Sequence, residues 1–452
     1  MSPHRQKNKS VALDRQSRAS QIDAILLYAT FGLLMFGPLA FGAVEPWSIF
    51  TVETGAALLA LLWLTRQYVT EEITIYWNPL FLPMLAFAAL MVIQIVFGLS
   101  AYRHDSISQA CLYGAYGVLA FLATQTLRRS SQARKIAMIL MAYGFLVAAF
   151  ALVQGVAPNG KLYWLRTPQM GGWIYGPYVN HNHYAGLMEL LVPVPLVIAL
   201  SRLAHEKTRI VAGMVAAVMV GTIFLCGSRG GMLAVFVELA LFAAVLLRQK
   251  RTARIVLSAV AFAAVLVSLL VWLGGKQLTS RVSSISTETR GEISGGMRLS
   301  IDRDGIRMFR QRPILGWGLG TFPVVYPQFR SFYTNFFVNE AHDDYVQLLA
   351  EMGTLGFAVM LWFLVTLFRR ARQKIGKWPT EVGGAATLAS ILGVTGILVH
   401  SFVDFNLQIP ANAALFYVLC TVAAAQPLLQ RVRKPMPVQE EDEQFFPASE
   451  VV

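Results

Sequence analysis

The stretch AHDDYVQLLAEMGTLGF, residues 341–357, places a histidine and two aspartates directly before an apolar run. It closes a long polar segment, 275–343, which interrupts an otherwise apolar chain. Earlier in this segment lies RMFRQRPILGWGLGTF, 307–322, which is basic and contains a Pro and several Gly residues that interrupt helix-forming sequence. Because apolar runs of spanning length flank the segment on both sides, we interpret it as a long loop between membrane helices.

The overall composition is that of a membrane protein. Of 452 residues, 56% are hydrophobic and only 14% are charged, whereas a soluble domain carries about 25% charged residues. The net charge is +13, but most basic residues lie in short loops between apolar runs, which argues against nucleic acid as a partner. The three cysteines lie in or beside apolar runs without close spacing, so neither a disulfide framework nor a cysteine metal site is expected.

Twelve runs meet the requirement of about 20 mostly apolar residues for a helical span. They are 23–43, 48–65, 79–98, 108–127, 135–156, 184–201, 210–227, 230–247, 255–274, 344–368, 384–404 and 410–429. The sequence therefore predicts an all-α polytopic membrane protein with about 12 transmembrane helices. Its one long loop is expected between the ninth and the tenth helix.

The predicted organisation has five parts with a defined orientation. They are a disordered basic tail at 1–22, helices one to nine at 23–274, the loop at 275–343, helices ten to twelve at 344–430, and a disordered tail at 431–452. With the N-terminus inside, 25 of the 38 Lys and Arg residues fall in cytoplasmic segments, as the positive-inside bias requires. Both termini are therefore predicted to be cytoplasmic, and the long loop to lie outside.

His342 stands at the outer start of the tenth predicted span. A histidine at this place can accept a proton from a hydroxyl group near neutral pH. Asp343 and Asp344 follow it, and acids in a first helical turn also favour the helix dipole. Stabilisation of a helix start would explain the two aspartates well, but it would explain the histidine poorly. We therefore take His342 as the candidate catalytic residue.

Arginine side chains on the same outer side are candidates for binding an anion. Arg229 lies in CGSRGG, 226–231, where only a few residues separate two predicted spans. A guanidinium group binds phosphate in a bidentate manner. Snorkelling at a helix end is the alternative, but an outward-facing arginine opposes the positive-inside bias. Within the long loop, Arg303, Arg307 and Arg310 are expected on one face of a helix over 299–311.

Two further passages place polar groups at the outer ends of spans. They are YVNHNHYAGLMEL at 178–190 and HSFVDFNLQIPANA at 400–413. His181 and His183 are two residues apart, but no third ligand stands at a fixed spacing, so no metal site is predicted. Polar packing of span ends is one explanation. The functional one is a glycan or acceptor site, for which the candidates are Asn180, His181, His183, Asp343, Asp344 and Asp404.

Together these stretches resemble the O-antigen ligase family and its relatives among the O-antigen and exopolysaccharide polymerases. The matching pieces are GPYVNHNHYAG, CGSRGG, MRLSIDRDGIRMFRQRPILGWGLGTF and AHDDYVQLLAEMGTLGF, in the order of the family. The resemblance extends over residues 25–430 and is strongest from 175 to 360. One departure is the pair of aspartates directly after the histidine in AHDDY, which makes this motif more acidic than the resemblance leads us to expect.

The resemblance implies a glycosyltransferase of the bacterial inner membrane that acts in lipopolysaccharide or surface polysaccharide biosynthesis. On the periplasmic face, such an enzyme moves a glycan from undecaprenyl diphosphate to an acceptor hydroxyl, without a nucleotide sugar, another cofactor or a required metal. Its partners would be the lipid-linked donor, a lipid A–core or glycan acceptor, and membrane lipids. Carried over, His342 is the base, and Arg229 with Arg298 holds the donor diphosphate, Arg303 being the alternative to Arg298.

Two other functions stay open at this stage. A polymerase of the same family would differ from a ligase mainly in its acceptor, a growing glycan. A lipid-linked glycan flippase or other transporter belongs to a different class, and transporters tend to show inverted repeats and polar groups at the midplane. The sequence shows neither feature, apart from Glu238. Convergence of polar side chains at the outer face would favour transfer chemistry over transport.

Overall fold

The computed structural model describes residues 3–168, 172–248, 295–334 and 337–426. This part of the chain is a bundle of helices with two isolated β-bridges and no strand. Nine of its helical segments are long and apolar enough to cross a membrane. The predicted all-α polytopic fold is therefore confirmed.

The helices of the bundle are α1 (Pro3–Leu39), α2 (Pro46–Thr70), α3 (Phe81–Val96), α4 (Arg103–Thr126), α5 (Ser130–Val156), α6 (His181–Leu191), α7 (Pro193–Leu200), α8 (Glu206–Cys226), α9 (Arg229–Arg248), α13 (Asp344–Ile375), α14 (Val382–His400) and α15 (Pro410–Ala424). Helix α6 and helix α7 form one span, broken where Pro193 cannot donate a backbone hydrogen bond. The predicted ninth span, 255–274, and the tail 431–452 lie outside the described residues.

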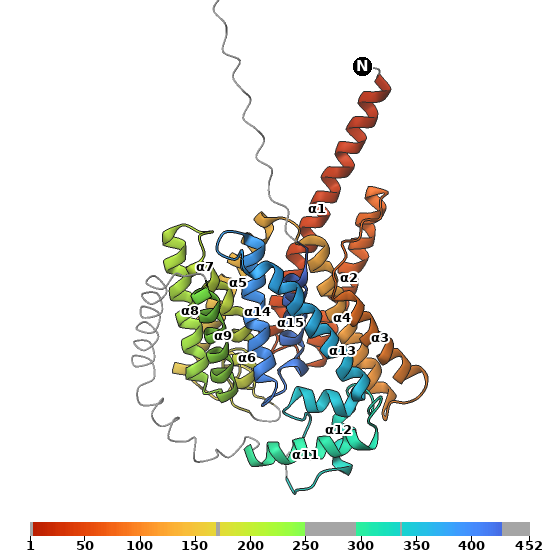
Figure 1. The fold of residues 1–452 in the computed structure, drawn as a ribbon, viewed down its shortest axis with the longest axis vertical. Helices are drawn as coiled ribbons and strands as arrows, with labels where there is room; N and C mark the ends of the chain where they lie inside the picture. Colours follow the sequence, from red (N-terminus) through yellow and green to blue (C-terminus); the bar gives the residue numbers. More distant parts are fainter. Residues whose placement is uncertain (1–2, 169–171, 249–294, 335–336, 427–452) are drawn as a thin grey trace, which may run out of the picture.

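Helix α14 lies at the centre of the bundle and packs against α6, α7, α9 and α15 (Figure 1). Its last residue is His400, so the predicted span 384–404 ends too late. Residues 401–409 form a turn before α15 instead, with a short 3-10 helix at Asn406–Gln408. The sequence pattern missed this end because the turn residues Phe402 and Val403 are as apolar as the span itself.

The basic N-terminal segment is not disordered as predicted. It is helical from Pro3 and continues without a break into the first span as α1. After Pro3 this segment contains no Gly or Pro until the span begins, and a spanning helix supplies the nucleus that an isolated helix lacks. In Figure 1 this end of α1 projects from the bundle, on the side opposite to α11 and α12.

The described part of the long loop, 295–334 and 337–343, forms a cap at one end of the bundle (Figure 1). It contains α11 (Gly295–Gln311), which begins four residues before the predicted helix 299–311, and the short helices α12 (Phe322–Val325) and Tyr326–Gln328. Buried Ile301, Met308 and Phe322 form its small core. The cap is therefore a packed layer that holds α11 in a defined place over the bundle.

Helix α13 joins the cap to the bundle through a break at Gly353. The backbone there has φ 62° and ψ −165°, a region essentially restricted to glycine. A Cβ atom at this position would lie 2.4 Å from the carbonyl oxygen of Ile314. The first part of α13, which follows His342, thus belongs to the cap, and only the part after Gly353 is free to cross the membrane.

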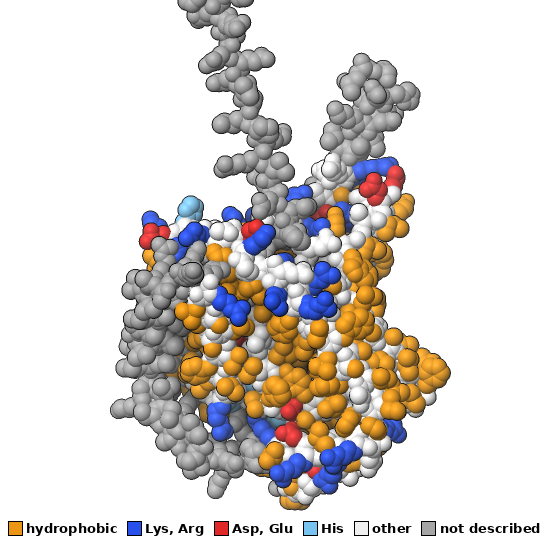
Figure 2. Space-filling model, viewed as in Figure 1, with side chains coloured by type: hydrophobic (Ala, Val, Ile, Leu, Met, Phe, Trp, Pro, Cys, Tyr) orange, Lys and Arg blue, Asp and Glu red, His pale blue; other side chains and the backbone are white. Residues whose placement is uncertain are grey.

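Hydrophobic side chains cover the middle of the face shown in Figure 2, with Lys and Arg above and below them. Exposed apolar residues such as Leu58, Leu61, Leu85 and Phe236 lie on the membrane-crossing helices. A soluble protein rarely exposes so large an apolar surface. This belt supports a multi-pass membrane protein whose spans lie in the lipid.

The orientation of the bundle can be tested with reporters fused after individual segments. We expect a fusion after residue 310, in α11, to report the periplasm, and a fusion in the 376–381 loop to report the cytoplasm, because Lys and Arg concentrate on the latter side. Paired alkaline phosphatase and fluorescent protein fusions measure this. A cytoplasmic signal from residue 310 would contradict both the topology and the site described below.

Candidate functional site

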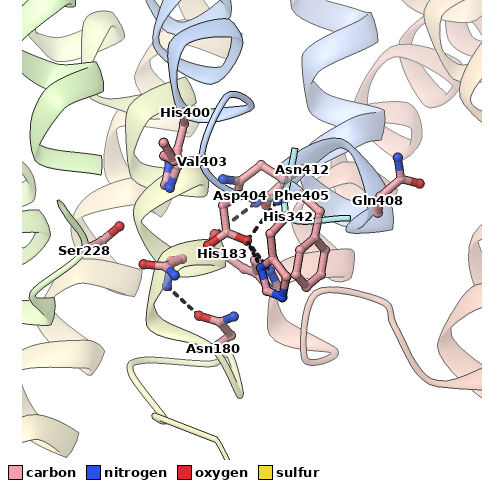
Figure 3. Close-up of polar contacts among 12 residues, drawn as sticks. Asn180, His183, Ser228, His342, His400, Val403, Asp404, Phe405, Gln408 and Asn412 are labelled. Atoms are coloured by element: carbon pink, nitrogen blue, oxygen red, sulfur yellow. Dashed lines mark hydrogen bonds and ion pairs between the residues drawn. The ribbon is translucent and has the colours of Figure 1, made fainter. Parts of the chain in front are cut away.

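The turn between α14 and α15 carries Asp404, on which three cationic or titratable side chains converge; Figure 3 shows two of them, His183 and His342. Oδ1 of Asp404 lies 3.6 Å from Nδ1 of His342 and 3.9 Å from Nε2 of His183, and Oδ2 lies 3.9 Å from Nη2 of Arg298. The carboxyl group is fully buried. Residues far apart in the sequence, on α6, the cap and the turn, therefore meet around one carboxylate.

The electrostatics of this cluster keep Asp404 ionised. Burial by itself raises the pKa of a carboxyl group, because a charge is poorly solvated inside a protein. For Asp404, the contributions of His342, Arg298 and His183 outweigh burial and hold its pKa well below the usual value. At any pH where a histidine titrates, Asp404 is therefore a carboxylate that can stabilise a protonated imidazole.

The backbone presents His342 in a strained conformation. Its φ is 57°, in the left-handed region that a residue with a side chain seldom adopts. The chain on either side of His342 is held: Ala341 donates its N–H to Oε1 of Gln347 at 3.0 Å, and Asp344 donates its N–H to the carbonyl of Ser401 at 3.0 Å. Strained residues persist where the surroundings fix them and concentrate at functional sites.

The two aspartates after His342 have other partners. Asp343 caps α13 by accepting hydrogen bonds from the N–H groups of Tyr345 and Val346. Asp344 accepts hydrogen bonds from Oγ of Ser401 at 2.7 Å and from the N–H of Leu407 at 3.2 Å. These contacts tie the start of α13 to the turn that bears Asp404, and so hold His342 beside it.

Phe405 packs against both histidines of the cluster. Its ring lies 4.8 Å from the ring of His183 and 4.7 Å from the ring of His342, edge-on in both cases. The side chain thus supports both imidazoles beside Asp404 (Figure 3). No feature of the sequence pointed to Phe405, because a phenylalanine beside a membrane span is ordinary.

The candidate arginines occupy different environments. Arg298, on α11, donates a hydrogen bond from Nη1 to the carbonyl of Val403 at 2.7 Å and faces Asp404. Arg303 is exposed on the same helix, as are Arg307 and Arg310, and Arg307 pairs with Asp304. Arg229 is exposed at the start of α9. Among the described residues, neither Arg229 nor Arg303 forms an ion pair.

The polar passages at 178–190 and 400–413 pack together, as their shared position at span ends suggested. Asn412 donates hydrogen bonds to the carbonyl of His183 and to Oδ1 of Asn406, and accepts one from the hydroxyl of Tyr178. Asn180 caps α6 by accepting the N–H of Asn182. His181 lies against the ring of Trp173, at 4.7 Å. Within the described ranges, no group of three His, Cys, Asp or Glu side chains is arranged to hold a metal ion.

The fold and this cluster define a polytopic α-helical membrane protein with a polar site at one end of its bundle. Residues 214–361 match the family model described as O-antigen ligase. The match covers about a third of the chain, and over this stretch the chain is similar to the O-antigen ligase family. It includes Arg229, Arg298 and His342, whereas His183 and Asp404 lie outside it. No curated protein matches the chain.

Proposed function

We propose that this protein transfers a glycan from undecaprenyl diphosphate to an acceptor hydroxyl on the periplasmic face of the inner membrane. The observation that carries the proposal is the convergence of His342 and Arg298 on Asp404. A base and a cation are thereby held side by side at the end of the bundle where the cap lies. Transfer from a diphosphate needs both groups, one for the attacking hydroxyl and one for the leaving group.

In the proposed reaction, His342 takes the proton of the acceptor hydroxyl. The acceptor oxygen forms a bond to the anomeric carbon of the donor sugar as the bond from that carbon to the diphosphate oxygen breaks. The electron pair leaves on undecaprenyl diphosphate, whose negative charge Arg298 and Arg229 stabilise. Asp404 holds the imidazolium that forms on His342. No further reactant is required for the balance of protons and electrons.

The remaining candidates take supporting places in the proposal. Asn180, His181 and His183 lie at the start of α6 and can meet acceptor or glycan hydroxyls. Arg303 lies one turn further along α11 than Arg298 on the exposed face, where it can reach an outer part of the donor. Asp343 and Asp344 act through the backbone contacts that position His342.

The proposal is tested with purified protein in nanodiscs, undecaprenyl-diphosphate glycan and separate acceptors. Glycan transferred to lipid A–core, with release of undecaprenyl diphosphate, would indicate a ligase. Transfer only to a second lipid-linked glycan would indicate a polymerase. Movement of the donor across the bilayer without any transfer product would instead favour a flippase, the class against which the one-sided cluster argues.

Arg229→Lys is expected to lose much of the activity although it keeps the positive charge. A lysine ammonium cannot reproduce the two parallel hydrogen bonds of a guanidinium to a diphosphate, so we expect donor affinity to fall by about tenfold or more. Titration of the donor lipid into the variant, beside turnover, measures this. Full turnover with normal donor affinity would remove Arg229 from the site, and Arg248→Lys, at the other end of α9, is the matched control.

Asp302 is expected to make donor binding depend on pH. Burial, with the nearby Asp343 carboxylate, raises the pKa of Asp302 to about 7, while Arg298 opposes the shift. Below that pH, Asp302 is neutral and Asp404 is the carboxylate that competes with the donor for Arg298; above it, Asp302 becomes a second competing carboxylate. Donor affinity should therefore weaken between pH 6 and pH 8, by roughly threefold to tenfold for one added charge near the surface.

Asp302→Asn should remove that dependence, because an amide stays neutral throughout. Donor titrations at pH 6 and pH 8 on both proteins provide the measurement. The variant should match the wild type at pH 6 and bind more tightly at pH 8. An unchanged slope in the variant would show that another group, not Asp302, titrates beside the donor.

A further inference from the structure

A second buried pair, formed by a histidine and a carboxylate, lies next to the turn that carries Asp404. Nδ1 of His400 is 2.8 Å from Oε1 of Glu189, and both side chains are at most 1% exposed. Neither residue has a part in the proposed reaction. A carboxylate inside a membrane protein is costly unless it is paired, and such residues are usually retained for a function. This pair therefore requires an explanation of its own.

The pair joins the elements that carry the site. Glu189 lies on α6, one and a half turns after His183, and His400 is the last residue of α14. The carbonyl of His400 accepts hydrogen bonds from the N–H groups of Val403 and Asp404, at 2.9 and 3.1 Å. The position of His400 thus sets the position of the turn in which Asp404 faces His342.

The start of α9 also rests on His400. A Cβ atom at Gly230 would lie 2.5 Å from Cδ2 and 2.6 Å from Nε2 of His400, and 2.9 Å from Cγ2 of Val403. Only glycine allows the backbone to approach so closely. Arg229, the neighbour of Gly230, is therefore placed relative to the turn through direct packing on the imidazole (Figure 3 shows His400, Val403 and Asp404 side by side).

We propose that the His400–Glu189 pair is a positioning device that fixes the distance between Arg229 and the Asp404 turn. In this way the pair would hold the donor diphosphate at a fixed distance from the base His342. The inference rests on the proposed function, because it assigns the pair a role only if Arg229 and His342 act on one donor. The pair touches neither donor nor acceptor, so its residues are positioning residues.

The geometry predicts which measurements change. Glycosyl transfer requires the reacting atoms in a near-attack arrangement, and a displacement of about 1 Å costs about 100-fold in rate. Donor affinity should respond much less, within about threefold, because long arginine side chains can adjust to a shifted phosphate. Loss of the pair should consequently lower turnover while donor binding is largely kept.

The test compares substitutions on both sides of His400 in the full-length protein in nanodiscs. Glu189→Leu removes the anchor of Nδ1 and should lower turnover by about 10–100-fold. Glu189→Gln keeps a hydrogen-bonding oxygen and should restore most of that loss. Gly230→Ala displaces the ring from the other side and should reproduce the leucine variant. Glu238→Leu removes the neighbouring buried carboxylate on α9 and should stay within about threefold of the wild type, because the hydrogen bond of His400 goes to Glu189 and not to Glu238.

Each variant is measured for thermal unfolding, affinity for the donor lipid and turnover per folded protein. Wild-type turnover in both Glu189→Leu and Gly230→Ala would overturn the inference. So would equal losses in Glu189→Leu and Glu189→Gln, or a loss in Glu238→Leu as large as in Glu189→Leu. His342→Ala is measured in parallel: if it keeps full turnover, the proposed function fails, whereas its loss beside an active Glu189→Leu variant contradicts only the positioning role.

Discussion

His342→Ala is expected to lower the turnover of glycan transfer by about 10²–10⁴-fold, the usual contribution of a general base. Affinity for the donor should change little, because Arg298 and Arg229 remain. The imidazole is held at 3.6 Å from a carboxylate that stays ionised, which suits a group that must gain a proton. Turnover and donor titrations on the purified variant separate the two effects.

The wild type should also lose turnover as the pH falls through the range in which histidine titrates, about pH 5–8. A protonated imidazole cannot accept the acceptor proton, so activity is present at the alkaline side and lost at the acid side. His104→Ala, an exposed histidine at the start of α4, serves as the control and should behave as the wild type. An alanine variant at 342 with full activity would move the search for a base to His183.

The fold was predictable because membrane spans are local properties of the chain. Length and apolarity alone locate runs such as 135–156 and 210–227, and the helices α5 and α8 occupy them. The ends of spans were less predictable wherever a tertiary contact sets them. Asp344 binds Ser401 and Leu407, and this contact, which no local pattern encodes, shapes the turn after α14.

The members of the site could be named one at a time, but their arrangement could not. His342, His183 and Asp404 each stood out as a polar residue at the outer end of a span, and Arg298 as a loop arginine that the family resemblance indicated. Nothing in the sequence showed that Asp404 is the common partner of the other three, because pairing across α6, α11 and the turn is a property of packing. The sequence also could not separate Arg298 from Arg303, which differ only in the face of α11 that they occupy.

Two further residues of the site were even harder to recognise from the sequence. Phe405 and Gly230 act through shape, Phe405 by packing on both imidazoles and Gly230 by leaving room for His400. An aromatic residue or a glycine beside a membrane span is common for many reasons. Such roles are visible only once the neighbours are known, so they mark the limit of what residue types in a single sequence can indicate.

Asp404→Asn is expected to be as damaging as the loss of His342, but in a different way. Asparagine keeps the shape of the side chain and removes the charge that faces His342, His183 and Arg298. An orienting carboxylate beside a catalytic histidine can contribute up to about 10⁴-fold to turnover. Because Arg298 also loses its partner, donor affinity should change in this variant, unlike in His342→Ala.

The dependence of turnover on pH provides a second, independent test of the role of Asp404. The pKa of Asp404 is held well below its usual value, so this group does not titrate where a histidine does and does not itself cause the acid loss of activity. Asp404→Asn removes the negative charge that lies 3.6 Å from Nδ1 of His342 and favours the protonated form of a histidine. The residual activity of Asp404→Asn should therefore survive to lower pH than that of the wild type. Asp304→Asn, which removes a buried carboxylate of the cap that faces Tyr326 and Ser331, should leave the profile where it is; an unshifted profile in Asp404→Asn would mean that Asp404 supports the turn without acting on the base.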